Sequence, residues 1–282
     1  MTTPLYSFAK RIRHLPVLAS HKHIWNALRR PYHRFMNLAG GVSLTVASGL
    51  NIRIPAEYSC GEWETYEPET VALVASWARA HDGGLFLDIG CSTGFFAAIV
   101  LFANPLVEVV AFDSDLASLV ATRRFCGLAN CALRIVYGFV TNSGLDTMLL
   151  EAEDKTRIAL ERERPSGDPG TTRYVCLSSR AQSEIPHLTL DGLFGGAEAG
   201  RSTLIKCDVE GAELLVLEGA SDLLRKCRPT LCLSVHPPAL TESGSSKEEV
   251  STFLMAAGYE AEVFAIDHEE HWWCTPVGNA KQ

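Results

Sequence analysis

Short, continuous apolar runs alternate with longer stretches of helical spacing along most of this chain. The clearest run covers residues 84–89 and leads into a turn that contains Gly90 and Gly94, after which residues 95–103 are entirely apolar. An apolar run of this length, bounded by turn residues, is typical of a parallel strand that is buried on both faces. Residues 84–103 are therefore predicted to form a strand, a tight turn and a buried helix.

Other segments repeat this alternation. Apolar runs predict strands at residues 107–112, 133–137 and 230–235, and a further strand that begins at Leu204 and ends in acids. Helical spacing predicts helices at residues 68–81, 212–224 and 248–257. Two last strands, at residues 261–266 and 271–274, are close enough in sequence to form an antiparallel edge hairpin. Strands that alternate with helices predict an α/β fold around a mostly parallel sheet.

The two ends of this pattern differ in character. Residues 1–60 are predicted to be a basic N-terminal extension, with one or two short helices broken by Pro16 and Pro31 and then a hairpin or pair of short strands within residues 42–54. Residues 61–282 are predicted to be the main domain. Within it, residues 145–200 are irregular and are interpreted as a cap or insertion, with a solvated helix and loop as the alternative.

Composition and charge narrow the classes of partner. The chain has 282 residues, of which 47% are hydrophobic, and a formal net charge of −8. Eight of the 25 Lys and Arg residues precede Glu57, the first acidic residue. Because the remaining body is acidic, a nucleic-acid partner is not expected. The basic N-terminus is interpreted as solvated surface, with weak peripheral contact to an anionic membrane or substrate as the alternative.

Cellular location is inferred from two further observations. The longest apolar run, residues 95–103, is far shorter than the ~20 residues that a membrane-spanning helix requires. The nine cysteines are scattered and form no C-x-x-C pair, a pattern that favours reduced thiols. A cytoplasmic protein is therefore expected.

The turn after the first predicted strand is a candidate ligand site. Glycines allow backbone amides to approach a ligand at a helix N-terminus, where the amide dipoles also point. Asp113 ends the next strand, where a carboxylate can accept both hydroxyl groups of a ribose. The alternatives are a turn that only packs helix on strand and an acid that caps the following helix, a role that suits Asp115. The candidate cofactor-binding residues are Asp88, Gly90, Cys91, Ser92, Gly94, Asp113, Ser114 and Asp208.

Several of these segments match a known family. The matching residues are 86–90 with Gly94, 111–113, 189–191, 206–213 with 216–220, Arg228-Pro229 and 234–236. With them, the chain resembles the FkbM-like group of S-adenosylmethionine-dependent methyltransferases over roughly residues 60–275. It departs from the family at Ser92, often glycine in methyltransferases, at Asp113, usually glutamate, and at Ser234, where an acid tends to precede the histidine.

The resemblance implies a fold, a cofactor and a reaction. The fold is a Rossmann-like, doubly wound sheet of seven strands, mostly parallel, and the cofactor is S-adenosylmethionine. The reaction is O-methylation of a hydroxyl on a small molecule such as a sugar, a polyketide or another secondary metabolite.

The candidate catalytic residues stand at the carboxyl ends of neighbouring strands, where ligands bind in open α/β sheets. His236 is expected to act as a general base or to orient the substrate, with Asp208 and Glu210 placing the acceptor and the sulfonium amine. A helix-capping Glu210 and a purely structural His236 are the alternatives. No metal is assigned, although Asp208, Glu210 and His236 would suit magnesium or manganese.

Two other functions use the same features. A nicotinamide-dependent oxidoreductase would also need a glycine turn and a distal acid, but Gly90 and Gly94 enclose three residues, unlike the G-x-G-x-x-G arrangement. A non-catalytic binding protein on a methyltransferase fold is the other alternative. His268 and His271 resemble a metal spacing, but in a strand hairpin they would point to different faces, so we assign them structural roles.

Overall fold

The computed structural model describes residues 22–129, 131, 133–143, 185–194 and 200–278. These residues form a central seven-stranded sheet with the order β10-β11-β9-β8-β3-β4-β5. Neighbours from β9 to β5 pair in parallel, whereas β11 pairs antiparallel with both β9 and β10. The strands are β3 (Leu85–Ile89), β4 (Glu108–Asp113), β5 (Leu133–Tyr137), β8 (Thr203–Cys207), β9 (Thr230–Val235), β10 (Tyr259–Ile266) and β11 (Glu270–Pro276). The predicted α/β sheet with its antiparallel edge hairpin is confirmed.

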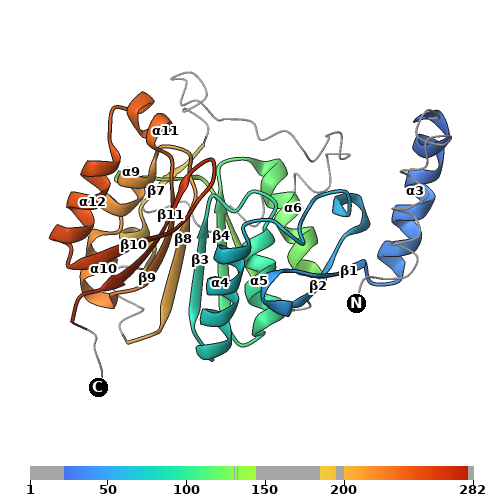
Figure 1. Cartoon of the computed structure of the whole chain (residues 1–282), viewed down its shortest axis with the longest axis horizontal. Helices are drawn as coiled ribbons and strands as arrows, with labels where there is room; N and C mark the ends of the chain where they lie inside the picture. Colours follow the sequence, from blue (N-terminus) through green and yellow to red (C-terminus); the bar gives the residue numbers. More distant parts are fainter. Residues whose placement is uncertain (1–21, 130, 132, 144–184, 195–199, 279–282) are drawn as a thin grey trace.

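Helices cover both faces of this sheet (Figure 1). Successive residues of a strand point to opposite faces, so Phe86 packs in one apolar cluster while Leu85 and Leu87 pack in the other. The first cluster includes residues of α4 (Pro68–Ala80), α5 (Phe95–Ala103) and α6 (Leu116–Gly127). The second includes residues of α8 (Leu190–Phe194), α9 (Glu213–Glu218), α10 (Ser221–Cys227), α11 (Pro237–Glu242) and α12 (Lys247–Ala256). Burial on both faces explains why the parallel strands read as continuous apolar runs.

The N-terminal residues add a helix and a hairpin. The strands β1 (Val42–Thr45) and β2 (Asn51–Ile54) pair antiparallel, as predicted. The 3₁₀ turn η1 (Ala47–Gly49) connects them, and a second 3₁₀ turn, η2 (Ala56–Tyr58), follows β2. The predicted break at Pro31 is wrong, because α3 (Lys22–Leu38) continues through it. Proline has no N–H group, so one carbonyl of the helix loses its hydrogen-bond donor. Because Pro31 is exposed, water can take the place of that donor. The hairpin shares the core of α4 and α5, and a domain boundary after residue 60 stays a prediction.

The helix predicted over residues 212–224 is also wrong, since α9 and α10 are separate. At Gly219, between them, an added Cβ would lie 2.0 Å from the Thr141 carbonyl oxygen, so the chain passes too close for a side chain. Asp191 then starts α10, because its carboxylate accepts from the backbone N–H of Asp222 at 2.9 Å and of Leu223 at 2.8 Å. Tertiary contacts therefore divide a segment whose apolar spacing is continuous.

The predicted cap at residues 145–200 lies mostly outside the described residues. Its described part contains α8 and β7 (His187–Leu188), which pairs in parallel with β6 (Phe139–Val140). In the described part of the chain, no helix has the length and hydropathy of a membrane-spanning segment.

Candidate active site

The turn after β3 lies at the carboxyl ends of the parallel strands, between β4 and β8. Gly90, Ser92 and Gly94 all have positive φ, at 77°, 50° and 76°. The backbone N–H groups of Gly90 and Cys91 donate to the Phe112 carbonyl at 3.0 and 2.9 Å. A Cβ at position 90 would lie 1.9 Å from the Asp208 carbonyl oxygen. Glycine is therefore required at position 90 by both the backbone conformation and the close approach of β8.

Asp113, at the end of β4, faces this turn. Its Oδ2 accepts from the Ser92 N–H at 2.8 Å, and its Oδ1 accepts from the Asp115 N–H at 2.8 Å. Burial raises the pKa of Asp113 to about 7. Asp115 accepts from the N–H groups of Ala117 and Ser118 at the start of α6. The predicted helix-capping role of Asp115 is therefore confirmed. Ser114 lies between them and is partly buried.

Two other predicted cofactor residues point into the protein. Asp88 is 1% exposed, and its Oδ2 accepts from the Ala97 N–H in α5 at 3.1 Å. Burial raises the pKa of Asp88 to about 6. The Cys91 sulfur lies 3.3 Å from the Thr122 hydroxyl oxygen. Both side chains therefore support the turn from the protein interior. A contact between either residue and a cofactor stays a prediction.

The carboxyl end of β8 holds a buried ion pair. Lys206 is 2% exposed, and its Nζ donates to Asp208 Oδ2 at 2.9 Å while lying 4.5 Å from the centre of the Phe96 ring. Burial acts to raise the pKa of Asp208, but the charge of Lys206 outweighs it and holds that pKa below its ordinary value. Asp208 is therefore an ionised carboxylate at neutral pH, and its Oδ1 lies 3.7 Å from His236 Nε2.

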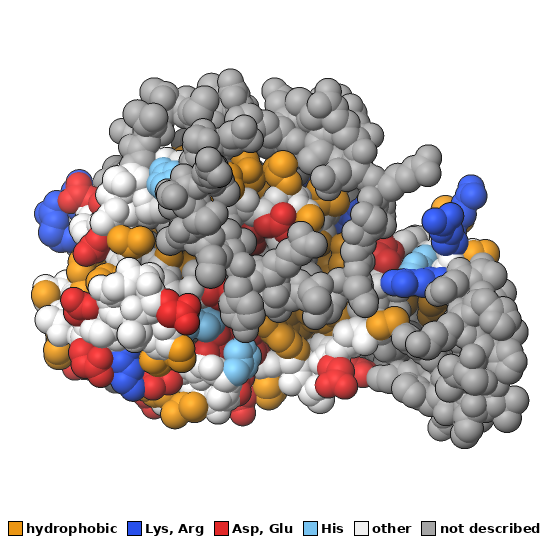
Figure 2. Space-filling view, turned by 90° about the horizontal axis from the view of Figure 1, so that it is seen from above, with side chains coloured by type: hydrophobic (Ala, Val, Ile, Leu, Met, Phe, Trp, Pro, Cys, Tyr) orange, Lys and Arg blue, Asp and Glu red, His pale blue; other side chains and the backbone are white. Residues whose placement is uncertain are grey.

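His236 follows β9 and is surrounded by carboxylates. Its Nδ1 lies 2.8 Å from Glu213 Oε1, and its Nε2 contacts Glu269 Oε2. Although burial acts to lower the pKa of His236, the hydrogen bonds with Glu213 and Glu269 raise it to about 10. Figure 2 looks onto this edge of the sheet, where histidine side chains lie next to acidic ones. The imidazole is thus held at both nitrogens, which favours an orienting role over that of a free base.

Glu210 is the less buried of the two predicted catalytic acids. It has a φ of 50° and is partly buried. The N-cap of α9 is Ala212, so the helix-capping alternative for Glu210 is wrong. Burial raises the pKa of Glu210, and the charge of Asp208 raises it further. A carboxylate with a raised pKa is a better proton acceptor than the ion-paired Asp208.

Other residues of the site were not predicted to have a role. Lys206 and Glu213 belong to the family-like stretch, and a lysine inside an apolar strand was a usable signal. Glu67 and Glu269 had no such signal, because each lies in an acidic loop far along the chain from β8. Asp208, His236 and Glu269 each place one possible metal-ligand atom close to the other two. The set considered from the sequence had Glu210 in the place of Glu269.

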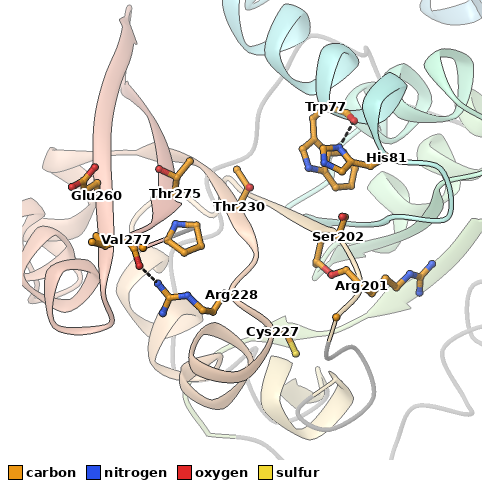
Figure 3. A pocket seen from close by; sticks show the side chains of 14 residues that line it. Trp77, His81, Arg201, Ser202, Cys227, Arg228, Thr230, Glu260, Thr275 and Val277 are labelled. Carbon is orange, nitrogen blue, oxygen red and sulfur yellow. Dashed lines mark hydrogen bonds between the residues drawn. The ribbon is translucent and has the colours of Figure 1, made fainter. Parts of the chain in front are cut away.

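A cavity lies at the opposite ends of the strands, lined by residues such as Trp77, His81, Arg201, Arg228 and Glu260 (Figure 3). Its arginines are engaged by the chain itself. Arg201 donates to the carbonyls of Gly83 and Gly84 and pairs with Glu108, and Arg228 donates to the carbonyls of Gly258 and Val277. We therefore place the candidate site at the carboxyl ends of the strands.

The strand order, the glycine turn and the acids at the strand ends define a Rossmann-like, doubly wound protein, with a candidate ligand site at the carboxyl ends of β3, β4 and β8. The family model of the methyltransferase FkbM domain matches residues 87–261, which is more than half of the chain. The chain therefore belongs to the FkbM methyltransferase family, and the resemblance inferred from the sequence is confirmed.

Solved structures of methyltransferases are also similar. An FkbM methyltransferase from Methylobacillus flagellatus KT has a TM-score of 0.46 and 14% sequence identity, with 69% of this chain and 44% of that chain covered. This chain thus spans less than half the length of that relative. An O-methyltransferase from Bacillus cereus, solved in complex with SAH, has a TM-score of 0.42 and 12% identity over 74% of this chain and 81% of that chain. No curated protein matches this chain.

Proposed function

We propose that this chain transfers the methyl group of S-adenosylmethionine to a hydroxyl on a small molecule. The observation that carries the proposal is the contact between the glycine turn and β8. Because the Gly90 backbone packs against the Asp208 carbonyl, a ligand on the turn would lie beside Asp208, Glu210 and His236. When bound, the cofactor supplies an electrophilic methyl group on a sulfonium with a good leaving group.

The residues of the turn fit this cofactor. Asp113 lies at the strand tip with both carboxylate oxygens facing backbone amides of the turn region, where it would accept the ribose hydroxyls. The backbone of Gly90, Cys91, Ser92 and Gly94 would approach the amino-acid portion, with Ser114 beside Asp113. Asp208 stays ionised next to the turn and would attract the cationic ammonium or sulfonium group.

The acceptor hydroxyl needs positioning and a proton acceptor. Glu210 suits proton acceptance because it is partly open and burial raises its pKa. His236 is held by Glu213 and Glu269 at its two ring nitrogens, so it suits orientation of the acceptor. Most of the acceleration would come from holding the hydroxyl oxygen ~3 Å from the methyl carbon.

A panel of hydroxylated small molecules, incubated with labelled S-adenosylmethionine, tests the proposal. We expect label in an oxygen-linked methyl group of at least one acceptor, and a fall in kcat of roughly 10²-fold or more in Glu210→Gln with unchanged affinity for the cofactor. Nucleic acids serve as the comparison, because a net charge of −8 disfavours them. Label on nitrogen or carbon only, or on nucleic acid only, would overturn O-methylation of a small molecule.

A further inference from the structure

The carboxylate of Glu67 is buried without a short hydrogen bond. Its side chain is 2% exposed, and neither of its carboxylate oxygens has a hydrogen-bond partner among the described residues. Glu67 also has a left-handed backbone, with φ at 36°, immediately before α4. A buried carboxylate without a short hydrogen bond is costly, and such a group in a native protein calls for a bound species that satisfies it.

Two other buried groups face Glu67. His271 Nδ1 lies 3.7 Å from Glu67 Oε2, and His271 Nε2 lies 3.6 Å from Glu269 Oε1. The side chains of His271 and Glu269 are 1% and 3% exposed. One ligand atom from each of the three residues lies within 4.8 Å of the other two. The three groups therefore converge from the loop before α4 and from the β10–β11 hairpin.

The spacing of these atoms suits a common central ion. One ring nitrogen of His271, one oxygen of Glu67 and one oxygen of Glu269 all lie within 4.8 Å of one another, and the contacts of His271 with the two carboxylates are longer than a good hydrogen bond. Ligand atoms that each lie about 2.1 Å from a tetrahedral metal are about 3.4 Å apart. Asp267 adds a further oxygen, 3.4 Å from His271 Nε2.

The local charge also favours a cation. Glu67 and Glu269 bring two carboxylates to one imidazole, and the buried ammonium of Lys206 is hydrogen-bonded to Asp208, although it also lies within the field of Glu67. In the neighbouring group of Asp208, His236 and Glu269, every residue already has a partner, with Lys206 on Asp208 and Glu213 on His236. Both oxygens of Glu67 lack a hydrogen bond, whereas Glu213, beside the neighbouring group, lacks one at Oε2 only, and this difference favours the Glu67 group.

We propose that Glu67, Glu269 and His271 bind one divalent first-row metal ion of the manganese or zinc type. Carboxylate oxygen and imidazole nitrogen are ligands that these ions accept. The ion would tie the loop before α4 to the β10–β11 hairpin. Since the other oxygen of Glu269 contacts His236, the ion would also fix one wall of the candidate active site.

Metal binding to the chelator-treated full chain tests this proposal. After equilibrium dialysis with Mn²⁺ or Zn²⁺, we expect one ion per chain in the wild type. Glu67→Gln and His271→Gln should each weaken binding by roughly 100-fold or more, because each removes a ligand. Glu262→Gln, an exposed acid on β10, and Asp208→Asn should bind as the wild type does. Circular dichroism reports whether each variant is folded.

A crystal of the metal-treated wild type gives a second readout that does not depend on the variants folding. We expect an anomalous peak between Glu67, Glu269 and His271. The proposal is overturned if the wild type binds neither ion, if folded Glu67→Gln binds as the wild type does, or if the peak lies elsewhere. Loss of binding in Asp208→Asn alone would place the ion on the neighbouring group and would also overturn it. Neither measurement depends on methyl transfer.

Discussion

His236 Nδ1 lies 2.8 Å from Glu213 Oε1, and this contact joins the end of β9 to the start of α9. Glu213 is fully buried, and the same oxygen also accepts from the Gly211 N–H at 3.1 Å. Where the resemblance implied an acid before the histidine, this chain has Ser234, which lies near His271 instead. The acid that holds His236 at Nδ1 therefore comes from the helix after β8.

Replacement of Glu213 by glutamine should destabilise the protein and slow turnover. Glutamine keeps the shape of the side chain but removes the charge that pairs with His236, so we expect a loss of roughly 1–3 kcal/mol in the free energy of unfolding. If His236 orients the acceptor, kcat should fall while the affinity for S-adenosylmethionine stays constant. Urea unfolding, turnover assays and calorimetry measure the three quantities. A change in cofactor affinity with unchanged kcat would contradict the orienting role.

The affinity for S-adenosylmethionine should rise with pH near neutrality. The pKa of Asp113 is raised to about 7 in the structure, so its carboxyl gains a proton as the pH falls through that value. A protonated carboxyl is a weaker acceptor for the ribose hydroxyls than a carboxylate. We expect Asp113→Asn to bind roughly tenfold more weakly above pH 8 and to lose the pH dependence. Calorimetric titrations from pH 5.5 to 8.5 check this, and an unchanged slope in Asp113→Asn would exclude Asp113 as its source.

Gly90→Ala should cost far more stability than Gly83→Ala, although both glycines have a similar positive φ, 77° and 71°. At position 83 an added Cβ would meet nothing within 4 Å, so that variant measures the backbone penalty alone, about 1–2 kcal/mol. At position 90 the Cβ would collide with the Asp208 carbonyl. Thermal unfolding of both variants separates the two costs. Equal losses would mean that β8 does not confine the turn.

Asp191→Ala should destabilise α10. Its carboxylate accepts from two backbone N–H groups at the start of that helix, Asp222 and Leu223, and loss of such a cap costs about 1 kcal/mol. Asp191→Asn keeps one acceptor oxygen and should lie between the alanine variant and the wild type. Denaturant midpoints measure the order of the three proteins. If both variants unfold as the wild type does, Asp191 does not determine where α10 begins.

The sequence predicted what depends on neighbouring residues, and it missed what depends on distant ones. The strand β9 covers residues 230–235 as predicted, because a strand buried on both faces is a continuous apolar run. The break at Gly219 was missed because it depends on Thr141 and Asp191, which no local pattern connects to that helix.

The candidate site was also predicted only in part: the residues at strand ends were found, and the buried acids from distant loops were not. Asp113, Asp208, Glu210 and His236 stand at strand ends, and the fold brings those ends to one edge of the sheet. Glu269 lies in a polar hairpin turn, and Glu67 lies in an acidic loop, positions that read as solvent-exposed in the sequence. Both are buried in the structure because β11 pairs with β9 and Glu67 lies against His271 of β11.

Calorimetric titration of the purified chain with S-adenosylmethionine, and separately with NAD, tests the central claim most directly. We predict micromolar binding of one S-adenosylmethionine per chain, weakened in Asp113→Ala, and no binding of NAD, because the turn lacks the G-x-G-x-x-G spacing. Binding of NAD in preference to S-adenosylmethionine, or binding of neither, would contradict the assignment of the glycine turn as a methyl-donor site.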